Sequence, residues 1–449
     1  MKLERWIGLV LVIVPLAGGC GLFPFAGNDG QGLLDDWGSV PDDWSDDFDS
    51  WDTDFEDWGD DLDGWDDFDD WGDDVDDWDA DADDWDADPG DWDPGLEDWP
   101  PVPDDFQCGD EQDVPCIAQH ALHWIRRASD VIPQLWDGQY RFDTWPLYVV
   151  DVTGSGSPQG YLVNPSPVPA GARRVTGNAA QGLTVYRYDG HASQASRTDN
   201  GLYDFFFDID GAEYSMMLID DWGGATLEGG SGDWIMTLVH ETFHAYQITT
   251  WSDPAGYIQD EQGYPITADI IALGLLETKI VSSAYKTADA EDAERYLRMF
   301  VAARTEKMRV DPSPEQLVRY MDNPQEHGEG SARYIEVKMM EAFDPEFPTR
   351  FFELYVDSIL EWGFESAADV RDHFAFGMWY ETGAIALRMM DTLGIDYVDA
   401  MTAGQTPYDI AADHFSMSAA ELGAALGDAQ TEFDWGGIQS EAQRYAALR

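Results

Sequence analysis

Three patterns of apolar and polar residues divide this chain. A short apolar stretch, Ile7 to Leu16, lies near the start. From residue 21 to about 105, tryptophan recurs at nearly every seventh position among aspartates and glycines. From Pro115 onward the apolar residues follow the spacings of helices and strands, so we expect the folded part to begin near residue 106.

The segment 106–232 has the pattern of an α/β lobe. Ile117 to Leu135 repeats apolar residues at helical spacing, and Pro133 is a candidate for ending this helix early. Runs of β-branched and aromatic residues between turn residues then predict strands. These runs are 146–152, 161–164, 183–188, 203–209 and 214–219. The glycine-rich stretch before residue 233 is predicted to be a loop.

The segment 233–449 is predicted to be mostly helical. No glycine or proline occurs from Trp234 to Trp251, and apolar residues there form a helical stripe. Further helices are expected at 266–285, 290–308, 326–343, 348–360 and 377–393. The expected fold class is α+β, with a mixed or antiparallel sheet in the first lobe and helices in the second. The helix that starts near Trp234 would lie at their junction.

The charge of the chain is strongly acidic. Its 449 residues include 90 Asp and Glu but only 24 Lys and Arg, giving a net charge of −66. Between Asp35 and Trp99 there is no Lys or Arg at all. A protein that binds nucleic acid needs a basic patch to neutralise phosphates, so we expect no nucleic-acid partner.

The acidic repeat, residues 21–105, is predicted to be a disordered stalk. Its heptad of tryptophans does not indicate a coiled coil, because aspartate is a poor helix former and like charges repel. Few apolar residues are present to offset the entropy of ordering. The alternative is a segment ordered by calcium or a docking tail for a basic partner, although no stretch matches a full EF-hand loop.

Residues 1–20 have the features of an export signal. Lys2 and Arg5 precede an apolar stretch that is too short to favour a membrane span. Small residues before Cys20 resemble a bacterial lipobox, which implies a lipid anchor on Cys20 and attachment to a membrane at the cell surface or in the periplasm. An ordinary secretory signal is the alternative. In an exported protein, Cys108 and Cys116 are expected to form a disulfide rather than remain free thiols.

The candidate chemistry lies in the run His240-Glu241-Thr242-Phe243-His244, which reads H-E-x-x-H. Two histidines four residues apart lie on one face of a helix, so both imidazoles can reach a single zinc ion. Glu241 is then placed to take a proton from a zinc-bound water. The pattern indicates metal-assisted hydrolysis, most often of peptide bonds.

Catalytic zinc usually has a third protein ligand. A metzincin would need glycine at position 247 and histidine at 250, and this chain has Gln247 and Thr250, which excludes that class. A glutamate on a later helix is the alternative. The candidates are Glu261, Glu277, Glu326 and Glu329.

Glu329 begins the run Glu-Gly-Ser-Ala-Arg-Tyr334, an E-G-x-A-x-Y pattern. Together with H-E-x-x-H, and with Tyr380-Glu-Thr-Gly-Ala384, it resembles the motifs of gluzincin peptidases of the peptidase MA-like kind, over roughly residues 230–395. The resemblance implies that Glu329 is the third zinc ligand and that Tyr380 stabilises the oxyanion. The small residues Gly330 and Ala332 are expected to let this helix approach the zinc helix closely.

The two helices predicted between 266 and 308 lengthen the usual gap between the motifs, which keeps Glu277 open as a rival ligand or as an acceptor for a histidine N–H. His327 is expected on another helix face than Glu329. Arg333 is a candidate to pair with Glu329, with a substrate carboxylate, or with a solvated partner.

The function expected from these residues is a zinc metallopeptidase that acts on peptides or proteins. One alternative is a cell-surface binding protein whose acidic tail binds calcium or a basic partner on a non-catalytic scaffold. Another is a zinc hydrolase acting on a non-peptide amide.

Overall fold

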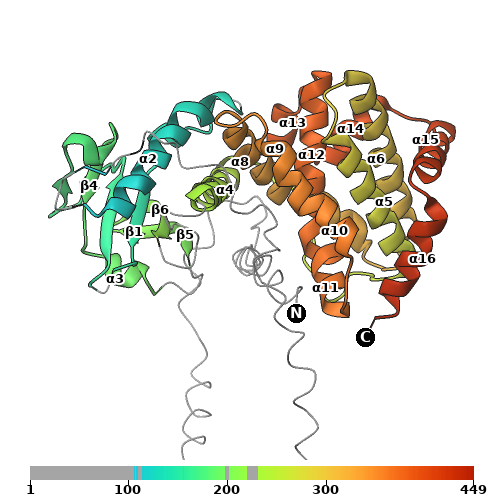
Figure 1. The fold of residues 1–449 in the computed structure, drawn as a ribbon, viewed down its shortest axis with the longest axis horizontal. Coiled ribbons are helices and arrows are strands. Elements are labelled where there is room, and N and C mark those ends of the chain that lie inside the picture. The colour runs from blue at the N-terminus through green and yellow to red at the C-terminus, as the bar shows by residue number, and fades with distance from the viewer. Residues whose placement is uncertain are drawn as a thin grey trace, which may run out of the picture. The chain divides into compact units, whose positions relative to one another are not determined.

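A computed structural model describes residues 106, 108–109, 114–136, 138–154, 156–197, 202–219 and 231–448. All of them belong to one compact unit. Residues 1–105, which include Cys20 and the acidic repeat, lie outside the described residues, as does nearly all of the predicted glycine-rich loop. The predicted α+β class is confirmed, because a six-stranded sheet precedes a mostly helical region (Figure 1).

The sheet is mixed. Its strands are β1 (Leu147–Asp151), β2 (Gln159–Val163), β3 (Arg173–Arg174), β4 (Val185–Arg187), β5 (Tyr203–Ile209) and β6 (Ala212–Ile219). Their order is β3-β4-β2-β1-β6-β5, and β1 with β6 is the parallel pair while the other neighbours are antiparallel. In the centre, Val149 lies opposite both Tyr161 of β2 and Met217 of β6. The five predicted strands are all present, and the two-residue β3 was not predicted.

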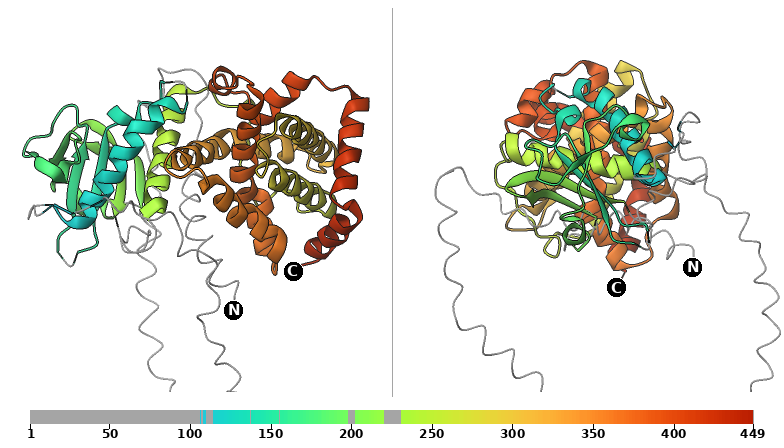
Figure 2. Two further views of the ribbon diagram at one scale, coloured as in Figure 1. Left: turned by 45° about the horizontal axis from the view of Figure 1, so that its top comes forward. Right: turned by 90° about the vertical axis from the view of Figure 1, so that its left-hand side faces the viewer.

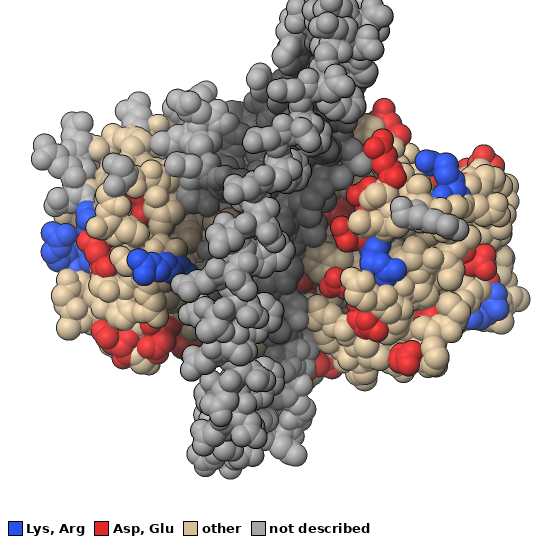
Figure 3. Space-filling model, turned by 90° about the horizontal axis from the view of Figure 1, so that it is seen from below, with Lys and Arg blue, Asp and Glu red and all other residues tan. Residues whose placement is uncertain are grey.

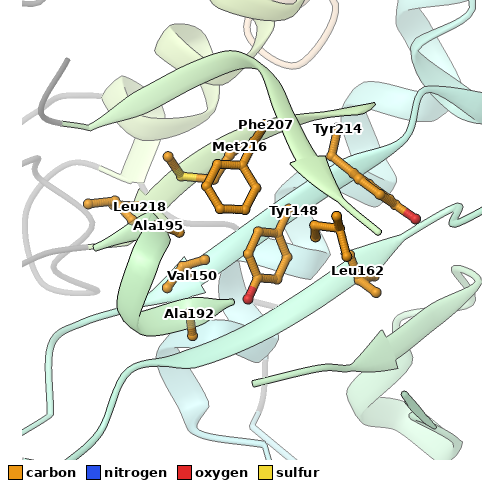
Figure 4. Close-up of a cluster of buried hydrophobic side chains, with 10 residues drawn as sticks. Tyr148, Val150, Leu162, Ala192, Ala195, Phe207, Tyr214, Met216 and Leu218 are labelled. Carbon is orange, nitrogen blue, oxygen red and sulfur yellow. The ribbon is translucent and has the colours of Figure 1, made fainter. Parts of the chain in front are cut away.

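The core of the sheet is apolar on both faces of β1. Tyr148 and Val150 pack with the short helix α3 (Ala192–Ala195), as the side chains in Figure 4 show. The alternate residues Leu147 and Val149 are buried as well. Helix α2 (Cys116–Val131) contacts β6, and it ends in a 3₁₀ turn at Pro133, as the proline predicts.

The helical region begins with α4 (Ser231–Thr250), the helix that carries H-E-x-x-H. It contacts β5, β6 and α2 on the sheet side and α8 on the helical side, so its predicted position at the junction is confirmed (Figure 2). The next helices are α5 (Ala268–Ala284), α6 (Ala290–Val310), α7 (Asn323–Gln325), α8 (Ser331–Glu341), α9 (Phe347–Phe352), α10 (Ser358–Trp362) and α11 (Ala367–Asp372). The last are α12 (Met378–Leu393), α13 (Val398–Thr402), α14 (Pro407–Phe415), α15 (Ala419–Glu432) and α16 (Trp435–Ala446).

Four π-helical turns join several of these helices: η9 (Val318–Asp322), η10 (Glu326–Gly330), η11 (Glu353–Asp357) and η12 (His373–Gly377). The sequence predicted single helices over 326–343 and 348–360, and each contains one of the π turns. A π turn holds an extra residue, so side chains on either side of it face different directions than in a continuous α-helix.

The start of the described fold is fixed by a disulfide between Cys108 and Cys116, which confirms the predicted pair. Cys116 is the first residue of α2. Within the described part of the chain, no helix is long and apolar enough to cross a membrane. On the face drawn in Figure 3, lysine and arginine are interspersed with aspartate and glutamate.

Candidate metal centre

Three buried side chains converge on one point between α4 and the π turn η10. His240 Nε2 and His244 Nε2 lie 3.0 Å apart, and Glu329 Oε2 is 3.1 Å from each of them. All three residues are buried, and their ligand atoms form a group that could hold a metal ion. The described residues therefore bring together the two predicted histidines and, of the four predicted glutamates, Glu329.

Glu329 reaches the histidines because of the local backbone. Glu326 and Glu329 stand three residues apart, a spacing that shares one face in an α-helix, but both lie in the π turn η10. Glu329 points to the histidines, whereas Glu326 Oε1 accepts a hydrogen bond from Arg304 NH2 at 2.7 Å. The π turn thus directs the Glu329 carboxylate to the histidines and the Glu326 carboxylate to Arg304.

Two glycines set the position of this turn. A Cβ on Gly330 would lie 2.7 Å from the Gly383 Cα, and one on Gly383 would lie 2.8 Å from the Gly330 Cα. Backbone atoms cannot yield at that distance, so only glycine permits this approach of η10 to α12. The helix that follows Gly330, α8, does contact the zinc helix α4, but Gly330 itself serves the approach to α12, so its predicted role is wrong, while that of Ala332 stays a prediction.

Each histidine is oriented by a second partner. His240 Nδ1 lies 3.2 Å from Glu336 Oε1, and His244 Nδ1 lies 2.6 Å from Gln247 Oε1. Gln247 Nε2 donates to Gly328 O at 3.0 Å, which requires its oxygen to face His244. Carboxylate and amide oxygens accept from Nδ1–H, so both Nε2 atoms keep their lone pairs for a metal.

Sequence reasoning did not find Glu336 or Gln247. Gln247 follows His244 by three residues on the same helix, and Glu336 follows Glu329 by seven, nearly two turns further along. Both spacings place side chains on a shared helix face and so carried a signal. The missing information was which of many polar residues on those faces meets a histidine.

Glu241 is buried beside the three converging atoms but does not join them. Among the described residues, its Oε2 has no hydrogen-bond partner. Burial raises the pKa of Glu241 to about 8; His244 lowers it, while the nearby Glu329 and Glu336 raise it further. This is the environment of a carboxylate that can gain and release a proton near neutral pH.

Glu329 has the opposite electrostatic environment. Burial alone would raise its pKa, but the charge of His244 and the hydrogen bonds from both histidines outweigh burial and lower the pKa well below its usual range. Burial also acts to lower the pKa of His240, and there the hydrogen bonds to Glu329 and Glu336 prevail and raise it.

Tyr380, predicted by resemblance to stabilise an oxyanion, lies at this site. It is the third residue of α12, and its ring stacks on the ring of His240 with the centroids 5.7 Å apart. The side chain is nearly buried. The fold therefore brings Tyr380 to the metal ligands, while its role in a reaction stays a prediction.

Glu277 is not at the metal centre, so its prediction as a rival ligand or histidine acceptor is wrong. Its oxygens accept from Arg304 Nε at 2.7 Å and from Lys307 Nζ at 3.3 Å. Burial acts to raise the pKa of Glu277, but the two cations outweigh it and lower that pKa. Both cations come from α6, which follows α5 in the chain, so a local ion-pair cluster takes up this carboxylate.

The remaining candidates also have other roles. Glu261 is half-buried in the connection before α5, and its carbonyl accepts from Arg371. His327 faces away from Glu329, as expected, and its Nε2 lies 2.8 Å from the Met401 carbonyl oxygen. Arg333 pairs with neither Glu329 nor solvent: its NH1 lies 2.6 Å from Glu336 Oε1 in a buried ion pair.

Comparisons with known proteins give no relative. No protein-family model matches this chain, and no match was found among curated proteins or among solved structures. The geometry of the buried site is therefore the observation from which a function is argued.

Proposed function

We propose that this chain is a zinc-dependent metallopeptidase of the gluzincin kind. The observation that carries the proposal is the convergence of His240, His244 and Glu329 at 3.0–3.1 Å, beside the buried Glu241, one oxygen of which has no partner among the described residues. The resemblance in the H-E-x-x-H and E-G-x-A-x-Y runs supports the same conclusion.

The donor set fits zinc. Two imidazole nitrogens and one carboxylate oxygen are typical of catalytic zinc, which keeps a fourth position open. Three donors of a tetrahedral ion with zinc's bond lengths lie roughly 3.3 Å apart, close to the spacing found here. Zinc, when bound, lowers the pKa of water and polarises a carbonyl group.

Glu241 is the proposed general base and acid. One of its carboxylate oxygens is buried without a hydrogen-bond partner among the described residues, so it is available to accept the proton of the attacking water. It would then deliver that proton to the leaving amine. Tyr380, stacked on His240, is the proposed donor to the oxyanion.

A peptide substrate is favoured by the strand nearest the site. β5 is the last strand in the sheet order, and no other strand of the described residues pairs with its outer side. Its Phe205 ring lies 6.2 Å from the ring of His244. The edge of a sheet can bind an extended peptide through main-chain hydrogen bonds, which a small amide cannot exploit as fully.

An extracytoplasmic location is part of the proposal. The disulfide between Cys108 and Cys116 is typical of exported proteins and agrees with the export signal predicted in residues 1–20. The lipid anchor on Cys20, its attachment to a membrane, and calcium binding by the acidic repeat stay predictions, because those residues lie outside the described ones.

The experiment compares the wild-type chain with Glu241→Gln. We expect both to bind about one zinc ion per chain, since the substitution removes no ligand, and only the wild type to cleave a quenched fluorescent peptide library. Thr237→Ser, on the same helix, serves as the control. Peptide cleavage by Glu241→Gln at the wild-type rate would refute the mechanism, and a wild-type chain without zinc would refute the metal assignment.

A further inference from the structure

Arg333 is a buried cation that pairs with a partner of one metal ligand. It lies in α8, one turn after Glu329, and its side chain is only 8% exposed. Its NH1 is 2.6 Å from Glu336 Oε1, the same oxygen that lies 3.2 Å from His240 Nδ1. A continuous chain of contacts thus runs from Arg333 through Glu336 to a metal ligand.

The guanidinium is held on its other sides by aromatic rings and a second carboxylate. Its carbon lies 5.1 Å from the ring centre of Phe351, 5.6 Å from that of Tyr355 and 5.3 Å from that of Tyr380. Its Nε is 3.5 Å from Glu381 Oε1. A planar cation between rings has little freedom to move, so it can fix what it contacts.

The charge of Arg333 also matters for Glu336. That side chain is only 3% exposed, and its neighbourhood holds three further buried carboxylates: Glu241, Glu329 and Glu381. A buried carboxylate needs a cation or hydrogen-bond donors to remain in place as an anion. Arg333 supplies the cation through its ion pair with Glu336.

We propose that Arg333 is a positioning residue for the metal centre. Through Glu336 it orients the ring of His240. Through its contact with the ring of Tyr380 it also holds that ring in place against a face of the same imidazole. This inference rests on the proposed function in that it requires the centre to bind a metal. It assigns to Arg333 neither contact with the metal nor contact with a substrate.

A double-mutant cycle on zinc affinity tests the proposal. Zinc is titrated against a competing chelator into the metal-free full chain of the wild type, Arg333→Met, Glu336→Gln and the double variant. Loss of a residue that orients a ligand weakens binding roughly 10- to 100-fold, so we expect that loss in Arg333→Met. The double variant should lose less affinity than the two single losses added together, because part of the effect of Arg333 passes through Glu336.

The sign of the effect separates positioning from simple repulsion. If Arg333 only repelled the dication, its removal would tighten zinc binding. Arg388→Met is the control, because Arg388 also pairs with a glutamate of α8, Glu341, in a more exposed ion pair that includes no partner of the histidines. The visible spectrum of bound cobalt should change in Arg333→Met and stay unchanged in the control.

The double-mutant cycle can still be measured if one variant does not fold. Should Arg333→Met fail to fold without metal, Arg333→Lys takes its place, with a smaller loss of affinity because an ammonium keeps the charge but lacks the planar fork. Unchanged or tighter zinc binding, or losses that add fully in the double variant, would overturn the proposal while leaving the proposed function intact. A wild-type chain that binds no zinc would overturn both.

Discussion

Glu241 and Glu329 are buried against the same histidines, yet their pKa values move in opposite directions. The Glu329 carboxylate lies 3.1 Å from both Nε2 atoms, and the charge of His244 together with those contacts outweighs burial. Glu241 is one residue from His240 but makes no such bond through Oε2 within the described structure, so burial prevails. At the scale of single residues, hydrogen-bond geometry rather than depth separates a ligand from a base.

The raised pKa of Glu241 has a consequence for stability without metal. Its pKa rises from 4.5 to about 8 on folding, so the folded chain keeps a proton that the unfolded chain releases between those values. Stability is therefore lost as pH rises through this window, by on the order of 3–5 kcal/mol. Denaturation with guanidinium in the presence of EDTA, at about pH 5 and about pH 8, measures the difference.

Glu241→Gln provides the reference for this measurement, because an amide carries no charge at any pH. The variant should lose less stability between the two pH values than the wild type does. Equal losses in both proteins would show that Glu241 is not the titrating group.

Glu329→Gln should weaken zinc binding by more than about 100-fold, since removing a ligand has a larger effect than removing an outer partner. Glu341→Gln on α8 is the control, because its carboxylate pairs with Arg388. Competition titrations measure both variants. If zinc were lost on Glu277→Gln and kept on Glu329→Gln, the ligand assignment would be wrong.

At the scale of elements, the sequence predicted type and order better than detail. Helices over 266–285 and 290–308 were predicted by helical periodicity, and α5 and α6 confirm them. The π turn at 326–330 was not predictable in this way. It adds a single residue to one turn, and the spacing of apolar residues over so short a stretch does not distinguish it from a continuous α-helix. The same limit applied to Glu277, whose partners Arg304 and Lys307 stand on the next helix.

The glycine pair predicts a second effect at this scale. Gly330→Ala should weaken zinc binding and destabilise the fold by about 1–3 kcal/mol, because the new Cβ would meet the backbone of Gly383 at 2.7 Å. Thermal unfolding and zinc titration measure the two effects.

Gly328→Ala is a matched control two residues earlier in the same π turn, where a Cβ meets nothing within 4 Å. Alanine also has the higher helix propensity, so this control should be neutral or slightly stabilising. A Gly330→Ala variant as stable as Gly328→Ala would argue that η10 and α12 do not need their close approach.

At the scale of the whole molecule, charge divides the sequence into an acidic repeat and a part of mixed charge that holds the candidate metal centre. The acidic repeat contains no Lys or Arg between Asp35 and Trp99, whereas the part from residue 98 onward contains every residue of the metal centre. The residues that the structure describes, from Phe106 onward, all belong to one compact unit. The sequence predicts that the folded part begins near residue 106, because a folded core needs apolar residues at helix and strand spacing that the repeat lacks.

Removal of the acidic repeat should therefore leave the chemistry unchanged. A chain that starts at Asp98 keeps Cys108, Cys116 and all elements that hold His240, His244 and Glu329. We expect its zinc affinity and its kcat/KM on a short peptide to stay within about twofold of the full chain, because contacts in the described site are local to this unit. A truncated chain that binds no zinc, or cleaves the peptide far more slowly, would place part of the site in the repeat and contradict this division of the molecule.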